Sequence, residues 1–488
     1  MTIWTPQIVG RPGPRYRAIA DMLAEDVIAG RLPAGERLPT HRDLAHRLRV
    51  TVGTVSRAYA EAERQGLIEA TIGRGTFVRN SGAAVAADAE YLPEPSAPAP
   101  LAMDVRRFVD RAGRATADSG ETLDLSLNYP FPAPIGPALV EGLRGMDDAA
   151  LLGTVGRYQP ANGMRAHREA GAVWLRRLGL EADADDVLVV PGCQGGLSIA
   201  FLALCRPGDT ILHEALTWPG LHATAASSGV RTIGLPIDAH GLVPDTFEAA
   251  CREYRPKLLY TMPTLHNPTA IVMPEERRRA IAAIARRHSV VVIEDDVYGF
   301  LLDAPPPPLC TFLPEAGIYV TSLSKAVAPG LRIGWLAAPS ALVPRLAAAV
   351  RTSMLMTSSV AAELAARTVA SGAAAHAVEA QRTEARARQA LAAERLKGLD
   401  FRSDDRAFHG WLRVPTPWRR DDFVAALRAR GVVVTPGSAF AGSALAAEAD
   451  THVRLCLCAV ADQSRLAMAL NIVAEVARGG SPSRLPEV

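Results

Sequence analysis

The chain has 488 residues and a formal net charge of +2, with 49% hydrophobic and 21% charged residues, a composition typical of soluble globular proteins. No stretch approaches the ~20 apolar residues of a membrane span, and the N-terminus lacks the apolar core of a signal peptide, so we expect a cytoplasmic protein that does not bind a membrane. The six cysteines form no disulfide or metal-binding pattern, and we therefore expect no metal site.

Residues 1–79 predict a compact basic domain, with twelve arginines against eight acidic residues. A helical apolar stripe runs through PRYRAIADMLAEDVIAG. A second helix is predicted in THRDLAHRLRV, which starts with Thr40, a typical N-cap residue. A third helix, GTVSRAYAEAERQGL, ends near Gly66, and IEATIGRGTFV predicts a two-stranded hairpin. This order of elements is that of a winged helix-turn-helix.

The stretch from GRLPAGERLPTHRDL to IGRGTFV resembles the GntR-type DNA-binding domain over its whole length. The third helix of such a domain enters the major groove, so we expect double-stranded operator DNA as a partner. The residues predicted to contact DNA are Arg42, Thr51, Thr54, Arg57 and Arg74. The family often has arginine where Val52 stands, which predicts a different operator sequence. The alternative is a winged helix that binds another protein.

A linker at residues 80–120, rich in alanine, proline and serine, separates this head from a second domain at 121–488. Beyond the linker, apolar runs of strand length alternate with helical patterns: VLVVPG, TILHEA, LLYTMP, VVVIEDD, IYVTSLS and GWLAAP. This alternation predicts an α/β fold with a mainly parallel sheet. The last part, 376–480, predicts a smaller α+β subdomain.

Polar residues follow three of these strands, at the edge of a parallel sheet where ligands bind. Among 53 basic residues only three are lysines, and one of them, Lys325, follows the strand IYVTSLS. Arginine cannot condense with an aldehyde, whereas lysine can. Lys325 is therefore the candidate for covalent chemistry.

The residues around Lys325 match the needs of pyridoxal 5'-phosphate, which requires an amine, a carboxylate on its ring nitrogen, neutral donors to its 3'-oxygen and a phosphate cradle. The candidates are Lys325 for the aldehyde, Asp295 for the ring nitrogen, Asn267 and Tyr298 for the 3'-oxygen, and Arg332 with Ser322 for the phosphate. Backbone amides of Gly192, Cys193 and Gln194, at a predicted helix N-terminus, complete the cradle. Trp218 is a candidate to stack on the ring.

These motifs resemble fold-type I aminotransferases from about 121 to 480, through HNPT, a following DxxY, and S-x-S-K…P-G-x-R-x-G, in which Ser324 precedes Lys325. The resemblance implies that Tyr158 contacts the phosphate of the neighbouring subunit's cofactor and that Arg454 holds the substrate carboxylate. Two departures stand out. The phosphate loop reads VPGCQGG where the family prefers threonine, serine and a second glutamine, and Trp218 replaces a commoner tyrosine.

A winged helix joined through a linker to such a domain is the layout of MocR-type transcriptional regulators. This resemblance implies a head-to-tail homodimer in which an amino acid or amine effector reacts with the Lys325 aldimine. Two alternatives remain open: a working aminotransferase with a regulatory head, and a DNA-binding protein whose large domain only dimerises. The effector is not identified by the sequence, nor is the choice between activation and repression.

Overall fold

The computed structural model describes residues 4–6, 14–28, 31–33, 35–64, 67–71, 75–78, 122–131, 136–146, 153–442 and 447–479. The chain divides into two compact units, residues 1–96 and 97–488. The linker expected at 80–120 lies outside the described residues.

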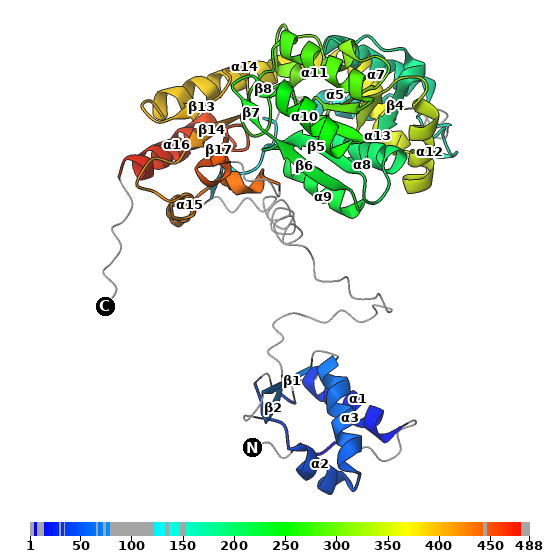
Figure 1. The fold of residues 1–488 in the computed structure, drawn as a ribbon, viewed down its shortest axis with the longest axis vertical. Helices are drawn as coiled ribbons and strands as arrows, with labels where there is room; N and C mark the ends of the chain where they lie inside the picture. The colour runs from blue at the N-terminus through cyan, green and yellow to red at the C-terminus, as the bar shows by residue number, and fades with distance from the viewer. Residues whose placement is uncertain are drawn as a thin grey trace. The chain divides into compact units, whose positions relative to one another are not determined.

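The N-terminal unit contains the expected winged helix-turn-helix (Figure 1). Its elements are α1 (Arg15–Ile28), α2 (His41–Leu48), α3 (Val52–Arg64), β1 (Ile68–Thr71) and β2 (Gly75–Val78). Helix α2 begins where predicted, because the Thr40 hydroxyl accepts a 3.2 Å hydrogen bond from the backbone N–H of Asp43. The strands pair antiparallel. Apolar residues that include Ile19, Leu44 and Val55 form one core between the helices.

A seven-stranded sheet forms the centre of the second unit. Its strands, in spatial order, are β4 (Val187–Val190), β12 (Gly334–Ala337), β11 (Gly317–Ser322), β10 (Val291–Asp295), β9 (Leu258–Thr261), β5 (Thr210–Glu214) and β6 (Arg231–Leu235). Strand β12 is antiparallel to both neighbours, and the other pairings are parallel. The prediction of a mainly parallel sheet is confirmed; β6 is a further strand that the apolar runs did not indicate.

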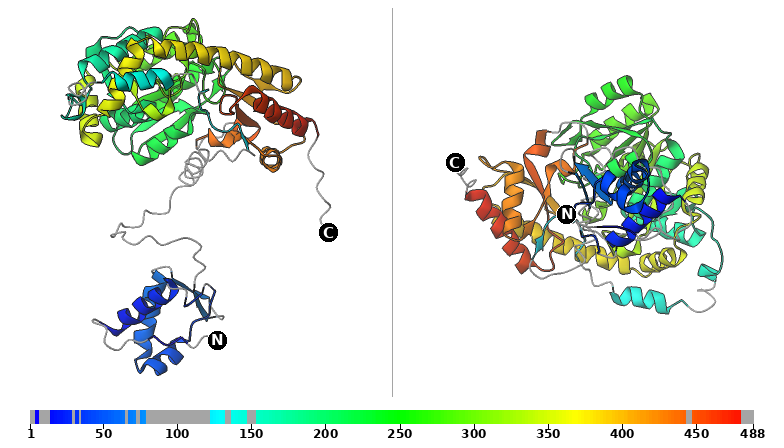
Figure 2. Two further views of the ribbon diagram at one scale, coloured as in Figure 1. Left: turned by 180° about the vertical axis from the view of Figure 1, so that it is seen from behind. Right: turned by 90° about the horizontal axis from the view of Figure 1, so that it is seen from below.

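Helices cover both faces of this sheet (Figures 1 and 2). They are α7 (Arg165–Arg177), α8 (Gly192–Leu204), α9 (Pro219–Ser227), α10 (Pro244–Tyr254), α11 (Glu275–His288), α12 (Val343–Met354) and α13 (Ser359–Ala370). Helix α5 (Gly136–Arg144) packs on α13. Alternate residues of β9 reach opposite faces. Leu258 and Tyr260 join a core that includes α7, α8 and α12, whereas Leu259 joins one with α10 and α11. Burial on both faces explains why these strands are continuously apolar.

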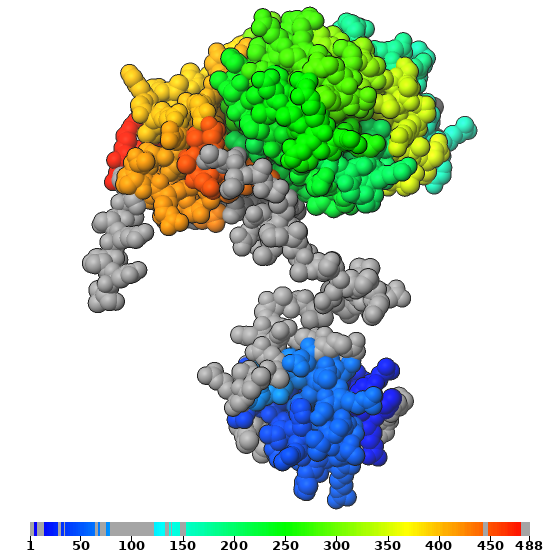
Figure 3. Space-filling model, in the orientation of Figure 1, coloured from blue at the N-terminus to red at the C-terminus, as the bar shows by residue number. Residues whose placement is uncertain are grey.

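The smaller α+β subdomain follows, as expected (Figure 3 shows its orange and red residues beside the green sheet domain). It comprises α14 (Ala373–Arg395), β13 (Phe401–Arg402), β14 (His409–Arg413), α15 (Arg420–Ala429), β15 (Val432–Val433), β16 (Thr435–Pro436), β17 (His452–Cys456) and α16 (Gln463–Arg478). Its sheet has the order β13-β14-β17-β16. Strand β3 (Leu123–Asp124) pairs in parallel with β15, which brings the first described strand of the second unit against the smaller subdomain.

Candidate functional site

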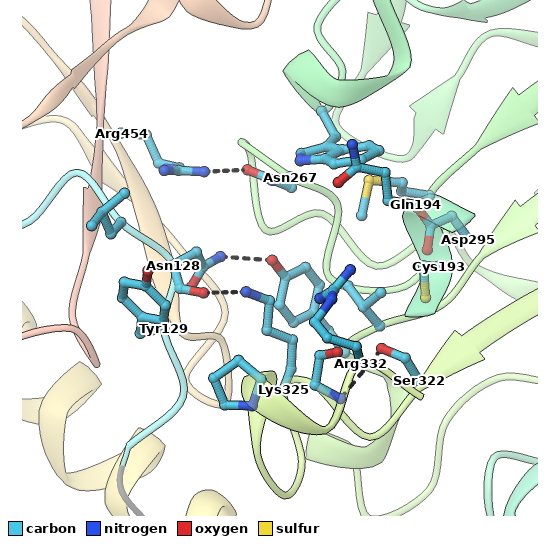
Figure 4. A pocket seen from close by; sticks show the side chains of 17 residues that line it. Asn128, Tyr129, Cys193, Gln194, Asn267, Asp295, Ser322, Lys325, Arg332 and Arg454 are labelled. Carbon is cyan, nitrogen blue, oxygen red and sulfur yellow. Dashed lines mark hydrogen bonds between the residues drawn. The ribbon is translucent and has the colours of Figure 1, made fainter. Parts of the chain in front are cut away.

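One pocket, of about 260 Å³, lies at the carboxyl ends of β9, β10 and β11, where the sequence predicts a ligand site (Figure 4). Its lining consists of Leu127, Asn128, Tyr129, Cys193, Gln194, Trp218, Met262, Asn267, Asp295, Val297, Tyr298, Ser322, Ser324, Lys325, Pro329, Arg332 and Arg454. The structure thus brings together the predicted cofactor and substrate residues except Gly192, the neighbour of Cys193, and Tyr158.

The Lys325 amine points into this pocket and donates a hydrogen bond to the backbone carbonyl of Asn128 (Figure 4). It lies 6.0 Å from the centre of the Tyr129 ring. Burial, with smaller contributions from the cationic Arg454 and Arg332, lowers the pKa of Lys325 from 10.5 to about 8. Since only the neutral amine attacks an aldehyde, this pKa favours a nucleophilic lysine near neutral pH.

The Asp295 carboxylate is buried and only half satisfied. Its Oδ2 accepts a 2.7 Å hydrogen bond from the Tyr260 hydroxyl, whereas Oδ1 has no hydrogen-bond partner among the described residues. Burial raises the pKa of Asp295 to about 6, against the lowering effects of the Tyr260 hydrogen bond and of the neighbouring Cys193 thiol. Leaving a buried acceptor unpaired costs about 1–3 kcal/mol, so this oxygen is suited to a ligand N–H group. This is the fit that a protonated pyridine nitrogen requires.

Two neutral donors lie beside Asp295. The Tyr298 hydroxyl oxygen accepts a 2.7 Å hydrogen bond from the Asn128 side-chain amide, and burial raises the pKa of Tyr298, so the phenol keeps its proton for donation. Asn267 Oδ1 accepts a 2.8 Å hydrogen bond from Arg454, which leaves the Asn267 amide N–H groups free to donate. The pair provides the donors expected for a phenolate oxygen of the cofactor.

Arg332 lies at the N-terminus of α8, where the sequence predicts the phosphate cradle, and its guanidinium is 3.4 Å from the Pro191 carbonyl oxygen. Gly192 has a φ of +75°, and a Cβ at this position would come within 3.2 Å of an Arg332 guanidinium nitrogen. Glycine therefore permits the arginine to approach the helix N-terminus, whose free N–H groups bind anions. Burial raises the pKa of Cys193 well above its usual value, so Cys193 is a neutral thiol and its backbone N–H is the group suited to an anion.

Ser322, Ser324 and Gln194 also line the pocket. Ser324 donates its backbone N–H to Ser322 Oγ at 3.4 Å, and its own hydroxyl has no partner among the described residues. Gln194 lines the same side of the pocket. Trp218 lines the pocket from the start of α9, and a Cβ on Gly220 would lie 2.1 Å from its indole ring. A glycine beside Trp218 is thus what allows the indole to lie there.

Arg454, from β17, is 3% exposed and is held from several directions. One terminal nitrogen donates to Asn267, and the other donates to the Ser126 carbonyl at 2.6 Å and to the Thr435 hydroxyl at 3.3 Å. Its Nε has no partner among the described residues. Tyr158 does not line the pocket and is 83% exposed, so its predicted contact with a neighbouring subunit's cofactor stays a prediction.

The predicted DNA-contacting residues of the head are mostly exposed. Arg42 is exposed on α2. The Thr51 hydroxyl accepts a 3.2 Å hydrogen bond from the backbone N–H of Thr54, so Thr51 also caps α3. The Arg57 guanidinium lies 5.4 Å from the centre of the Tyr16 ring, which restrains this side chain. The predicted contact of Arg74 lies outside the described residues.

A model of the aminotransferase class I and II family matches residues 123–473. The chain belongs to this family. Ahead of it, residues 15–78 match the gntR family of bacterial regulatory proteins. The expected MocR-type layout, a GntR-type helix-turn-helix joined to an aminotransferase-like domain, is therefore confirmed.

Full-length relatives share this layout. The HTH-type transcriptional regulator YdeF of Bacillus subtilis is 29% identical over 453 residues, which cover 93% of this chain and 92% of YdeF. The HTH-type transcriptional regulator TauR of Rhodobacter capsulatus is 28% identical, with coverage of 88% and 90%. An archaeal alanine:glyoxylate aminotransferase structure has the same fold, with a TM-score of 0.69 and 23% identity over 78% of this chain and 98% of that one. The MocR-type protein is thus a transcriptional regulator with an aminotransferase-like domain, and that fold family depends on pyridoxal phosphate.

Asn128 and Tyr129, which line the pocket of this MocR-type regulator, and Tyr260, which donates to Asp295, are not among the residues predicted from the sequence. Asn128 and Tyr129 follow the short strand β3, and Tyr260 lies within β9. An Asn-Tyr pair directly after the apolar LDLSL run is a signal that could have marked the first two. Tyr260 carries no such signal, because a tyrosine in a buried strand is ordinary.

No helix in the described part of the MocR-type chain is both long and apolar enough to span a bilayer. Among the same residues, no group of three or more His, Cys, Asp or Glu side chains is arranged to hold a metal ion. All six cysteines are free thiols.

Proposed function

We propose that this MocR-type regulator binds pyridoxal 5'-phosphate at Lys325 and senses an amino acid or amine there, which changes how its head binds operator DNA. One observation carries the proposal. The Lys325 amine and the unpartnered oxygen of Asp295 line the same pocket, as the aldehyde and the ring nitrogen of this cofactor require. Neither dimerisation nor DNA binding needs such an arrangement.

The other residues have defined tasks under this proposal. When bound, the cofactor supplies an electrophilic carbon that amines attack. Asn267 and Tyr298 donate to its 3'-oxygen, Trp218 stacks on its ring, and the α8 N-terminus with Ser322, Ser324 and Arg332 holds its phosphate. The Asn128 carbonyl accepts the Lys325 amine whenever that amine is not bonded to the cofactor.

Arg454 is the site proposed for an effector carboxylate. Two other fully buried arginines have acidic partners: Arg278 lies 3.3 Å from Glu294, and Arg388 lies 2.6 Å from Glu384. Arg454 has no carboxylate partner among the described residues, although it is equally removed from water. A buried guanidinium without a counter-ion is suited to an anionic ligand. This favours an amino acid over a simple amine.

The proposed assembly is a head-to-tail homodimer bound to double-stranded operator DNA. The exposed Tyr158 supports the dimer, since a tyrosine left 83% exposed is available to a second copy. The exposed Arg42 and the exposed N-terminal end of α3 support the DNA contact. An effector changes DNA binding only if it binds the two conformations of the dimer with different affinity.

The second candidate function is that of a working aminotransferase. The lowered pKa of Lys325 favours it, because the same amine that forms the Schiff base also moves protons in transamination. Sustained turnover of an amino acid with a keto acid, in the absence of DNA, would establish that the protein is a working aminotransferase.

The proposal is tested by loading the purified chain with pyridoxal phosphate and titrating amino compounds while the cofactor absorbance and operator binding are followed. We expect both signals to change at the same effector concentration. In the Lys325→Ala variant we expect operator binding to persist and the response to disappear. A response that survives this substitution would refute covalent sensing.

A further inference from the structure

Phe440 is a buried residue of the smaller subdomain that contacts Arg454. It follows a short 3-10 helix, Gly437–Ala439, and its side chain is fully buried. The Arg454 guanidinium carbon lies 4.8 Å from the centre of the Phe440 ring. The Trp411 ring packs edge-on against Phe440, with ring centres 5.9 Å apart and an interplanar angle of 85°. The ring therefore forms a platform under the guanidinium.

An aromatic platform has a specific electrostatic advantage over an acidic partner. The face of the ring carries partial negative charge and stabilises a desolvated cation. A carboxylate from the protein would neutralise Arg454 and occupy its N–H donors, as Glu294 does for Arg278. Phe440 instead brings no negative charge, and the hydrogen-bond partners Asn267, Ser126 and Thr435 are neutral, so Arg454 has no counter-ion among the described residues. The platform thus stabilises Arg454 and keeps it ready for an external anion.

The backbone of Phe440 reaches the other side of the pocket. Its carbonyl accepts a 2.9 Å hydrogen bond from the backbone N–H of Thr217, and the next residue, Ala441, pairs with Leu216 in an antiparallel bridge. Thr217 directly precedes Trp218, which lines the pocket. Phe440 is thereby anchored to the sheet domain, which fixes its ring in place beneath Arg454.

We propose that Phe440 is a positioning residue that gives this pocket its selectivity for carboxylate-bearing ligands, by holding the Arg454 guanidinium in place without a carboxylate partner. This inference rests on the proposed function, since it concerns the same pocket. The inference goes beyond the proposed function because it assigns a role to Phe440, which does not line the pocket.

The test uses three matched probes: L-alanine, ethylamine, which lacks its carboxylate, and propionate, which lacks its amine. L-Alanine and ethylamine are titrated against the cofactor absorbance of the loaded full-length protein, and propionate binding to the protein is measured by calorimetry. In Phe440→Leu, we expect affinity for L-alanine and propionate to fall about 2- to 30-fold, the range of a cation–π contact, and that for ethylamine to stay unchanged. Phe440→Tyr keeps the ring face and is expected to restore carboxylate binding.

Phe423→Leu is the matched control, because Phe423 is also fully buried in the smaller subdomain and packs edge-on against Trp418 rather than against Arg454. It is expected to lower stability without changing the selectivity. Equal losses for L-alanine and ethylamine in Phe440→Leu would overturn the inference, as would unchanged propionate binding. Wild-type protein that binds propionate no better than Arg454→Met does would overturn it as well. If neither amine changes the absorbance but propionate binding still depends on Phe440, the sensing proposal fails and this inference stands.

Discussion

Asp295 accepts a 2.7 Å hydrogen bond from the Tyr260 hydroxyl, and this contact occupies one of its two carboxylate oxygens. The other oxygen is buried at the pocket without a partner among the described residues. One carboxylate oxygen of Asp295 is therefore held by the protein, and the other is available to a ligand. The Tyr260 hydrogen bond also lowers the pKa of Asp295.

Cofactor affinity is expected to fall as the pH drops through about 6. Burial raises the pKa of Asp295 in the folded protein to about 6, from ~3.9 in the unfolded chain. In the cofactor-free protein the protonated carboxyl therefore stabilises the fold below pH ~3.9, and this stabilisation is lost as the pH rises through about 6. The ring N–H pairs with the ionised form, which predominates only above that pH. Dissociation constants for pyridoxal phosphate, measured from about pH 5 to about pH 8, will give the midpoint pH of the change in affinity. Tyr260→Phe should move it upward, because the tyrosine hydrogen bond lowers the pKa. Asp295→Asn should bind weakly at every pH, and a midpoint retained in that variant would contradict the assignment.

The rate at which pyridoxal phosphate bonds to the empty protein is expected to rise with pH and level off above about 8. The reason is that burial lowers the pKa of Lys325 to about 8, and the neutral amine is the reactive form. Arg454→Met removes a neighbouring positive charge, so the midpoint should shift upward. Rapid mixing with absorbance detection measures the rate. A midpoint near the ordinary value of lysine would show that Lys325 is not desolvated.

Gly192→Ala is expected to weaken cofactor binding about tenfold, equivalent to about 1.4 kcal/mol. The new methyl group would press on Arg332 at 3.2 Å and distort the cradle. Gly208→Ala is the matched control, since Gly208 also has a positive φ, +90°, but faces open space. Both variants should lose about 1–2 kcal/mol of stability from the strained backbone. Calorimetric unfolding and a phosphate-dependent cofactor titration separate the two effects, and equal cofactor losses would argue against the cradle.

In the head, Arg42→Ala is expected to weaken operator binding for all sequences alike and to reduce the slope of log affinity against log salt by about 1. Because the Arg42 side chain is exposed, the unfolding temperature of the Arg42→Ala variant should equal that of the wild type. Thr51→Ala should behave differently, because the Thr51 hydroxyl caps α3 and its loss costs about 1 kcal/mol of stability. Gel-shift titrations at several salt concentrations, with thermal unfolding of each variant, test both. An unchanged salt slope in Arg42→Ala would remove this residue from the interface.

The elements that the sequence predicted correctly are those determined by local chemistry. Thr40 caps α2, the apolar runs form strands of the central sheet, and Asn267, Asp295 and Lys325 come together because the carboxyl ends of neighbouring strands share one edge. Each of these inferences needs only a short stretch of sequence and a general rule of topology.

Other features depended on the packing of distant segments. Asn128 meets both Lys325 and Tyr298 because the residues after β3 lie against the sheet domain, and Phe440 lies beneath Arg454 because the smaller subdomain is anchored at Thr217. The sequence by itself determined the two domain types, the strand pattern and the residues of covalent chemistry, since local propensity and motif spacing encode them. Only the tertiary structure decided which oxygen of Asp295 is free and which ring supports Arg454. Both depend on side-chain contacts between elements, and no periodic pattern in the sequence encodes such contacts.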